Sequence, residues 1–132
     1  MKEGSEDLVR YRISRSLETL IEAETMIKNK FWNASVNRIY YSYYYVVSGI
    51  LLKKSIETNS HKGTRQMFGL HFVQTGLVPK EDGRFFSDLY DRRQTGDYED
   101  FVLYEEETVL KLFSQAKDFI ERMVELLKIN NI

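Results

Sequence analysis

Apolar side chains recur at helical spacings through most of the chain. Residues 6–28 carry one stripe of Val9, Ile13, Leu17, Leu20 and Ile27, separated by charged residues. Steps of three, four and seven positions place these side chains on one face, so the segment is predicted to be an amphipathic helix. Ser5, followed by Asp7, is a favourable start signal for it.

Residues 31–54 form a second predicted helix with two adjacent occupied faces. One stripe consists of Val36, Tyr40, Tyr43, Val47 and Ile50, and the neighbouring stripe consists of Asn33, Asn37, Tyr41, Tyr44 and Leu51. A helix with two such faces is expected at the centre of a fold.

Two shorter helices are predicted over residues 64–75 and 80–95. Gly76 is expected to end the first in a C-cap position, and Pro79 prevents its continuation. Gly96 is expected to end the second.

The last part of the chain carries a heptad pattern. Its members, stepping alternately by four and three positions, are Val109, Phe113, Ala116, Ile120, Met123 and Leu127. Such a seam predicts a long helix packed against neighbours. Three long helices and two shorter ones, joined by short loops, predict an all-α, antiparallel up-and-down bundle of four to five helices, forming one domain over residues 1–132.

Composition narrows the classes of function. The chain has 132 residues, and its formal charge is 19 − 20 = −1, so a nucleic acid would have to be bound by a local basic patch. Cysteine is absent, which excludes disulfides and thiolate chemistry and fits a cytoplasmic protein. The N-terminus has no signal-peptide pattern, and no apolar run approaches the ~20 residues of a membrane span. A membrane partner is therefore not expected.

Five of the six residues at 40–45 are tyrosine. At 100° per residue they must surround the helix, so some belong to the core. The others either pack with tethered hydroxyls or form a surface that stacks on bases or on a partner subunit. Arg38 on the same helix needs a partner, and the acidic residues after the fourth helix are candidates.

Several site types lack their sequence signals. His61 and His71 have no neighbours at metal-ligand spacing, so neither a metal nor another cofactor is expected. The chain has no glycine-rich phosphate loop and no nucleophile elbow. Arg65 and His71 superficially resemble a nuclease pair, but their separation of about two helical turns makes coincidence the better interpretation.

The stretch "DRRQTGDYED" at 91–100 has two interpretations. In the first, Asp88 and Arg92 form an ion pair at i,i+4, and the paired arginines complement the C-terminal end of a helix. In the second, adjacent arginines with a glutamine and a tyrosine bind a phosphate group, with the nearby acids orienting the arginines.

The chain resembles the HEPN domain, a helical-bundle family named for nucleotide binding in higher eukaryotes and prokaryotes. The closer likeness is to its small stand-alone branch, which pairs with minimal nucleotidyltransferases. The resemblance rests on "AETMIKNKFWNASVNRIYYSYYYVVSGIL" at 23–51, "HKGTRQMFGLHFVQTGLVPKE" at 61–81 and "FFSDLYDRRQTGDYEDF" at 86–101.

The resemblance implies a cytoplasmic homodimer of a toxin–antitoxin type. Active members carry an arginine, a polar residue and, after a few residues, a histidine, and two such motifs at a dimer cleft cleave RNA without metal. Here the arginine matches Arg93, with Arg92 as the near alternative, and the polar residue matches Gln94. Tyr98 stands about where the histidine would be. A tyrosine that some relatives carry two places later corresponds to Asp100, so that feature does not transfer.

Histidine suits proton transfer near neutral pH, whereas tyrosine, with an ordinary pKa near 10, does not. The sequence therefore favours a nucleotide- or RNA-associated binding protein with weak or no catalysis. The alternatives are a metal-independent endoribonuclease toxin with a variant site and a purely structural interaction bundle. The candidate catalytic residues are Arg93 and Tyr98. The candidate ligand-binding residues are Arg38, Tyr41, Arg92, Gln94 and Asp97.

Overall fold

A computed structural model of the chain describes residues 3–128, and its side chains from residue 5. All of its regular elements are helical. In chain order they are α1 (Glu3–Lys28), α2 (Trp32–Lys53), α3 (His61–Phe68), the π-helical turn η1 (Gly69–Val73), α4 (Lys80–Tyr98) and α5 (Glu106–Lys128). No helix in this described range is long and apolar enough to cross a membrane.

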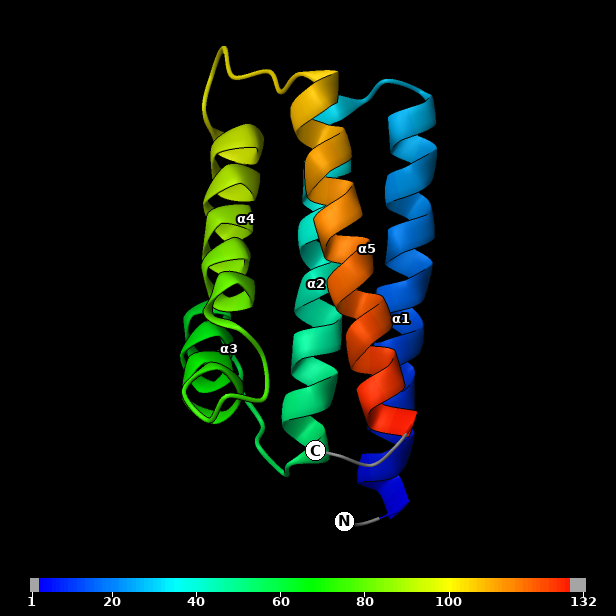
Figure 1. Cartoon of the computed structure of the whole chain (residues 1–132). Helices are drawn as coiled ribbons and strands as arrows, with labels where there is room; N and C mark the ends of the chain where they lie inside the picture. Colours follow the sequence, from blue (N-terminus) through cyan, green and yellow to red (C-terminus); the bar gives the residue numbers. More distant parts are fainter. Residues whose placement is uncertain (1–2, 129–132) are drawn as a thin grey trace.

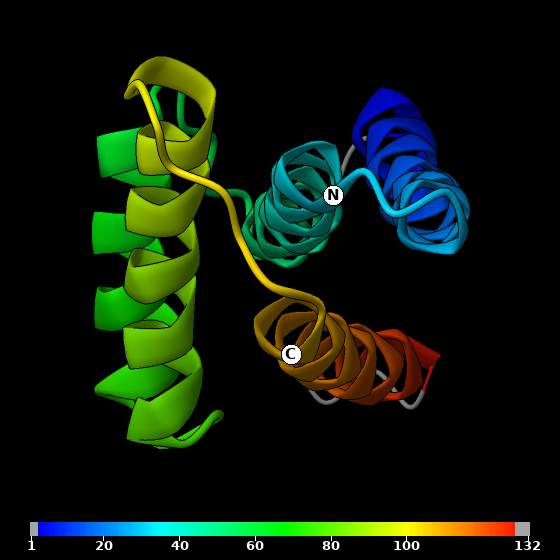
Figure 2. The ribbon, with the colours of Figure 1, turned by 90° about the horizontal axis from the view of Figure 1, so that it is seen from above.

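The four long helices alternate in direction, with α1 and α4 running opposite to α2 and α5 (Figure 1). Seen from above, α1, α2 and α5 are viewed nearly along their axes, whereas α4 is seen more from its side, with α3 next to it (Figure 2). The α3–α4 pair is therefore inclined to the other three helices. The predicted all-α, up-and-down bundle is confirmed.

Helix α2 occupies the centre, as its two-stripe pattern predicts. It contacts α1, α4 and α5, and its residues Val36, Tyr40, Tyr43 and Val47 are fully buried. The Tyr43 ring stacks on Phe119 of α5, with centroids 4.1 Å apart. Its hydroxyl donates to the backbone carbonyl of Asp82 in α4 at 2.9 Å. One central tyrosine therefore contacts two other helices.

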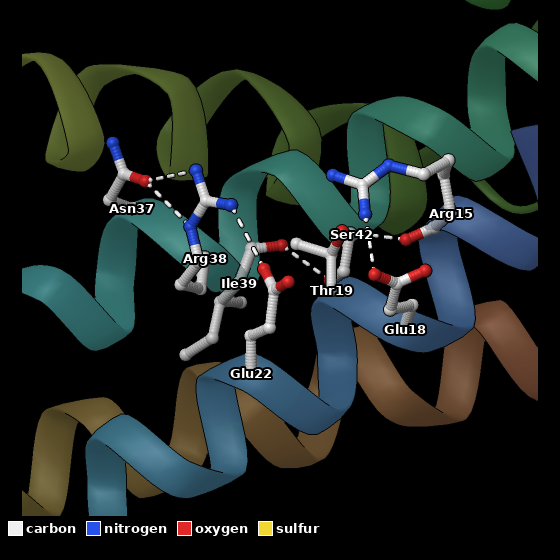
Figure 3. A network of polar contacts seen from close by, with 8 residues as sticks. All are labelled: Arg15, Glu18, Thr19, Glu22, Asn37, Arg38, Ile39 and Ser42. Carbon is white, nitrogen blue, oxygen red and sulfur yellow. Dashed lines mark hydrogen bonds and ion pairs between the residues drawn. The ribbon is translucent and has the colours of Figure 1, made fainter.

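Polar groups add to the contact between α1 and α2. The buried Ser16 hydroxyl donates to the Ser42 carbonyl at 2.6 Å. Figure 3 shows Arg38 of α2 pointing toward Glu22 of α1, with Asn37 on the other side of its guanidinium. A Cβ added at Gly49 would lie 2.9 Å from Ile13 Cδ1, so glycine at this position permits the close approach of the two helices.

Helix α3 begins three residues before the predicted start at residue 64. The side chain of Ser60 accepts a hydrogen bond from the Gly63 N–H at 2.9 Å and caps the helix. The helical path continues through η1 to Val73. The segment ends two residues earlier than predicted, and its C-cap residue is Gln74 rather than Gly76. Gly76 lies in the following turn, in the left-handed region at φ 80°, and its N–H donates to the Val73 carbonyl.

The prediction that Gly96 ends the fourth helix is wrong, because α4 continues to Tyr98. Glycine is needed there for space: a Cβ would lie 2.9 Å from Tyr104 Cε2. The Tyr104 ring is fixed in turn, because its hydroxyl donates to the Arg92 carbonyl at 2.7 Å. Gly96 thus lets the α4–α5 loop pack against α4.

The amide of Asn33 holds the same loop against the start of α2. Its Nδ2 donates to the carbonyls of Gly96 at 3.2 Å and Val102 at 2.7 Å. Its Oδ1 accepts the Tyr104 backbone N–H at 3.0 Å. The predicted seam of α5 is also confirmed: Val109, Ala116, Ile120 and Met123 are buried, and Phe113 and Leu127 pack against the core.

We expect Gly96→Ala to lower the free energy of unfolding by about 1 kcal/mol. Overpacking costs about 1–3 kcal/mol, and the gain in helix propensity offsets up to about 1 kcal/mol of this. Gly69→Ala is the matched control, since nothing lies within 4 Å of a Cβ at that position. Urea unfolding of both variants checks the expectation. A Gly96→Ala protein as stable as wild type would contradict it.

Candidate functional site

Arg93 lies on the inward side of α4 with only 6% of its surface exposed. Its guanidinium faces the rings of three tyrosines. The Cζ atom lies 4.9 Å from the ring centroid of Tyr40, 5.5 Å from Tyr41 and 5.3 Å from Tyr90. These distances are within the range of cation–π attraction, which is stronger when the cation is removed from water.

The polar atoms of Arg93 are less well satisfied than its ring contacts. Its Nη1 lies 3.7 Å from Asp97 Oδ2, which is an ion pair but longer than a hydrogen bond. Its Nε has no hydrogen-bond partner, and it is the one buried side-chain nitrogen or oxygen in residues 5–128 of which this is true. A buried cation normally has its donors paired. The described residues therefore leave the hydrogen-bonding capacity of this guanidinium partly unused.

His61, the first residue of α3, lies in the same group of rings. Its Nδ1 is 2.6 Å from the Tyr40 hydroxyl oxygen, and its ring centroid is 4.7 Å from that of Tyr44. Within the described residues the Tyr40 hydroxyl has no other hydrogen-bond partner, and burial raises its pKa. We therefore infer that the hydroxyl donates to Nδ1, which leaves the neutral imidazole with its proton on Nε2.

Arg65 completes this side of the site. It lies one turn after His61 on α3, and its Cζ is 4.0 Å from the ring centroid of Tyr90. Burial, followed by the positive charges of Arg93 and Arg65, lowers the pKa of His61. We call this group the arginine–tyrosine cluster. Its members, from α2, α3 and α4, are Tyr40, Tyr41, Tyr44, His61, Arg65, Tyr90 and Arg93.

A chain of polar contacts connects the cluster to α1. Asn37 Nδ2 donates to Asp97 Oδ2 at 2.9 Å, and Asn37 Oδ1 accepts from Arg38 Nε at 3.0 Å and Nη2 at 2.8 Å. Arg38 Nη1 then donates to Glu22 at 3.1 Å (Figure 3). The partner of Arg38 is thus Glu22 rather than an acid after the fourth helix, because α1 lies closer. Arg38 is connected to Asp97 only indirectly, through the side chain of Asn37.

The remaining predicted site residues lie outside the cluster. Arg92 pairs with Asp88 at 2.9 Å, as the i,i+4 spacing predicts. Gln94 is exposed. Tyr98, at the last position of α4, is 73% exposed. Of the candidates, the structure brings Arg93, Tyr41 and Asp97 together, with Arg38 next to them.

Sequence reasoning missed His61, Arg65 and Tyr90. The family motif has its histidine a few residues after the arginine on the same segment, whereas His61 comes from a different helix than Arg93. The available signal was the i,i+4 spacing of His61 and Arg65 after a serine that caps the helix. Among the described residues, no three or more His, Asp or Glu side chains are grouped as metal ligands would be.

The environment of His61 makes the stability of the fold depend on pH. The pKa of His61 is lower in the folded protein than in the unfolded chain, so the unfolded chain binds a proton first as pH falls. The contribution of His61 to stability is full above about pH 6.5 and decreases as pH falls through the folded pKa.

We expect His61→Asn to lose less stability than wild type between pH 7 and pH 5 in urea unfolding. Equal losses would contradict this expectation.

Comparisons with known proteins agree with this architecture. The chain is 39% identical over 126 residues to a "UPF0332 protein" of Thermotoga maritima, which covers 93% of this chain and 96% of the relative. It is 30% identical to "Putative toxin MJ0142" of Methanocaldococcus jannaschii, covering 95% of this chain and 90% of the relative. A second protein of that organism, "Putative toxin MJ0605", is 32% identical and covers 84% and 82%.

A family model described as the HEPN domain matches residues 9–127. This match contains α2, α3 and α4, and with them every residue of the arginine–tyrosine cluster. The family that the sequence resembles is therefore confirmed over nearly the whole length of the helical bundle, and the chain belongs to the HEPN domain family.

Proposed function

We propose that this protein is a toxin-like HEPN protein that binds RNA or a nucleotide at the arginine–tyrosine cluster. The observation that carries the proposal is the buried guanidinium of Arg93, whose Nε has no partner and whose Nη1 lies only loosely against Asp97. A phosphate group would supply the acceptors that Arg93 lacks. The relatives named as toxins support the toxin-like role.

The neighbours of Arg93 suit the rest of a nucleotide. Arg65 adds a second guanidinium, and His61 Nε2 adds a neutral N–H donor on our assignment of its proton. The rings of Tyr41 and Tyr44 are half-buried, so each keeps part of its surface for contact with a base. Bases stack on aromatic faces at about 1–3 kcal/mol each.

The partners in this proposal are a second copy of the chain and a minimal nucleotidyltransferase. Large apolar side chains at the α4–α5 end support a protein interface there. Phe101 and Leu103 are almost completely exposed, and Phe31 and Tyr98 are more than half exposed. Tyr98 directly follows Asp97, the residue that pairs with Arg93, so a protein bound at this end would lie near one edge of the cluster.

Arg93→Met tests the binding site. It removes the charge and keeps much of the side-chain volume, so we expect affinity for a fluorescein-labelled single-stranded RNA to fall at least tenfold, as when a hydrogen bond to a charged group is lost. The control is Arg10→Met, because Arg10 is an exposed residue of α1 that pairs with Asp7. Fluorescence anisotropy gives the affinity, and a melting temperature checks the fold.

Equal affinity of wild type and Arg93→Met would reject this binding site. Absence of RNA and nucleotide binding by wild type would reject the proposed function and leave the structural bundle, in which Arg93 only joins helices.

A metal-independent endoribonuclease is the second candidate, favoured by the histidine that α3 places beside Arg93. In this reaction the 2′-oxygen forms a bond to the adjacent phosphorus and the bond from phosphorus to the 5′-oxygen breaks. The imidazole takes the 2′-OH proton, and water protonates the departing 5′-oxygen, giving a 2′,3′-cyclic phosphate and a 5′-OH. This requires an unprotonated Nε2. The contact with Tyr40 favours the opposite tautomer, so binding is the better supported function.

Two amide substitutions separate these roles of His61. His61→Gln places an N–H donor near the position of Nε2, whereas His61→Asn keeps a group near Nδ1 for Tyr40 and lacks the outer donor. We expect His61→Gln to bind RNA within about twofold of wild type and His61→Asn to bind about tenfold more weakly, the effect of one hydrogen bond to a charged group.

The same proteins are assayed for RNA cleavage in EDTA. Cleavage by wild type that both substitutions abolish would establish the endoribonuclease instead, because neither amide accepts a proton. No cleavage by wild type would reject that candidate.

A further inference from the structure

A groove separates α3 and η1 from α4, beyond the arginine–tyrosine cluster. Its charged lining residues are Arg65, Lys80 and Arg84, and no carboxylate lines it. The other lining residues are apolar or small, and they are Phe68, Gly69, Val73, Gly83, Phe86 and Ser87. The groove is therefore lined by positive and apolar side chains, in a chain whose formal charge is −1.

Among the residues that the structure describes, these three cations form no ion pairs, although Glu81 is next to Lys80 in sequence. Residues 58–80 contain no aspartate or glutamate. Asp82 of α4 instead forms two hydrogen bonds of 2.9 Å with Arg122 of α5. Within the part of the chain that the structure describes, none of the three groove cations has an ion-pair partner within 4.0 Å.

The wall of the groove contains an unusual backbone element. Gly69 and Val73, the first and last residues of η1, both line it. η1 continues α3 directly as a single π-helical turn at its C-terminal end, and the chain leaves the helical path after Val73. Nothing lies within 4 Å of a Cβ at Gly69, so the backbone there is open to a ligand.

Arg65 joins the groove to the cluster. It lines the groove, and its guanidinium also lies on the ring of Tyr90. The same ring contacts the guanidinium of Arg93. Lys80 and Arg93 are thirteen positions apart on α4, which corresponds to about 20 Å along the helix. One phosphate group cannot contact both ends of this path, whereas a strand with several phosphates can.

We propose that the groove carries the phosphate backbone of a single-stranded RNA as it leaves the arginine–tyrosine cluster. This inference rests on the proposed function and extends it: the ligand is a strand rather than a mononucleotide, and Lys80 and Arg84 bind its phosphates. A basic groove continuous with aromatic rings is the arrangement by which proteins bind single strands. An acidic protein would use the cations but not the stacking surfaces of Tyr41 and Tyr44.

The salt dependence of binding tests the path. Each phosphate contact in a single strand contributes about 0.7 to the slope of log K against log salt concentration. We expect the double substitution Lys80→Gln and Arg84→Gln to reduce the slope for a twelve-nucleotide RNA by about 1.4, while the affinity for AMP stays within twofold. Lys117→Gln on α5 is the control. A DNA of the same sequence should lose the same amount of slope, because the contacts are to phosphates.

The outcomes separate this inference from the proposed function. If Arg93→Met weakens RNA binding but the double substitution leaves the slope unchanged, the groove path is wrong and the cluster remains a binding site. If the double substitution weakens the binding of an acidic protein but not that of RNA, the groove path is also wrong. If wild type binds neither RNA nor AMP, both proposals fail. A melting temperature equal to that of wild type shows that the double variant is folded.

Discussion

The burial of one positive charge among tyrosine rings organises this side of the molecule. Arg93 belongs to α4, two of the rings facing it belong to α2, and Tyr90 connects it to α3 through Arg65. A buried guanidinium without compensation would be strongly destabilising, so these rings must remain in place wherever Arg93 is buried. The tyrosine-rich stretch of α2 therefore provides aromatic faces for a cation as well as volume for the core.

The carboxylate that pairs with Arg93 is held in place by a chain of polar contacts from other helices. Asp97 lies 3.7 Å from the guanidinium and is held there by Asn37, which also accepts two hydrogen bonds from Arg38. Arg38 is in turn held by Glu22 of α1. Negative and positive side chains thus alternate from Glu22 of α1 through Arg38 of α2 to the Asp97–Arg93 pair of α4, and Asn37 bridges Arg38 and Asp97. Arg93 is stabilised within the fold without being fully neutralised.

The sequence was sufficient for the long helices and insufficient for the contacts between them. The heptad of α5 and the stripes of α2 depend on local periodicity, which the sequence contains directly. Gly96 was misjudged because glycine has a low helix propensity, whereas its role depends on the Tyr104 ring, eight residues later. His61 was missed for a related reason, because its distance from Arg93 is set by the packing of α3 on α2 and α4. Of the residues around Arg93, Tyr41 and Asp97 were candidates from the sequence, whereas Arg65 and Tyr90 are recognised only in the fold.

The stacking of Tyr43 on Phe119 has a consequence for synthesis of the chain. Every residue of the arginine–tyrosine cluster lies before α5, yet the central helix, which carries Tyr40, Tyr41 and Tyr44, is packed on one side by α5. A ribosome completes the cluster residues before it makes Phe119, so the nascent chain has all the groups of the site without the helix that fixes their positions. The stacking of Phe119 on Tyr43 therefore becomes available to the tyrosine-bearing helix only after every group of the site has been made.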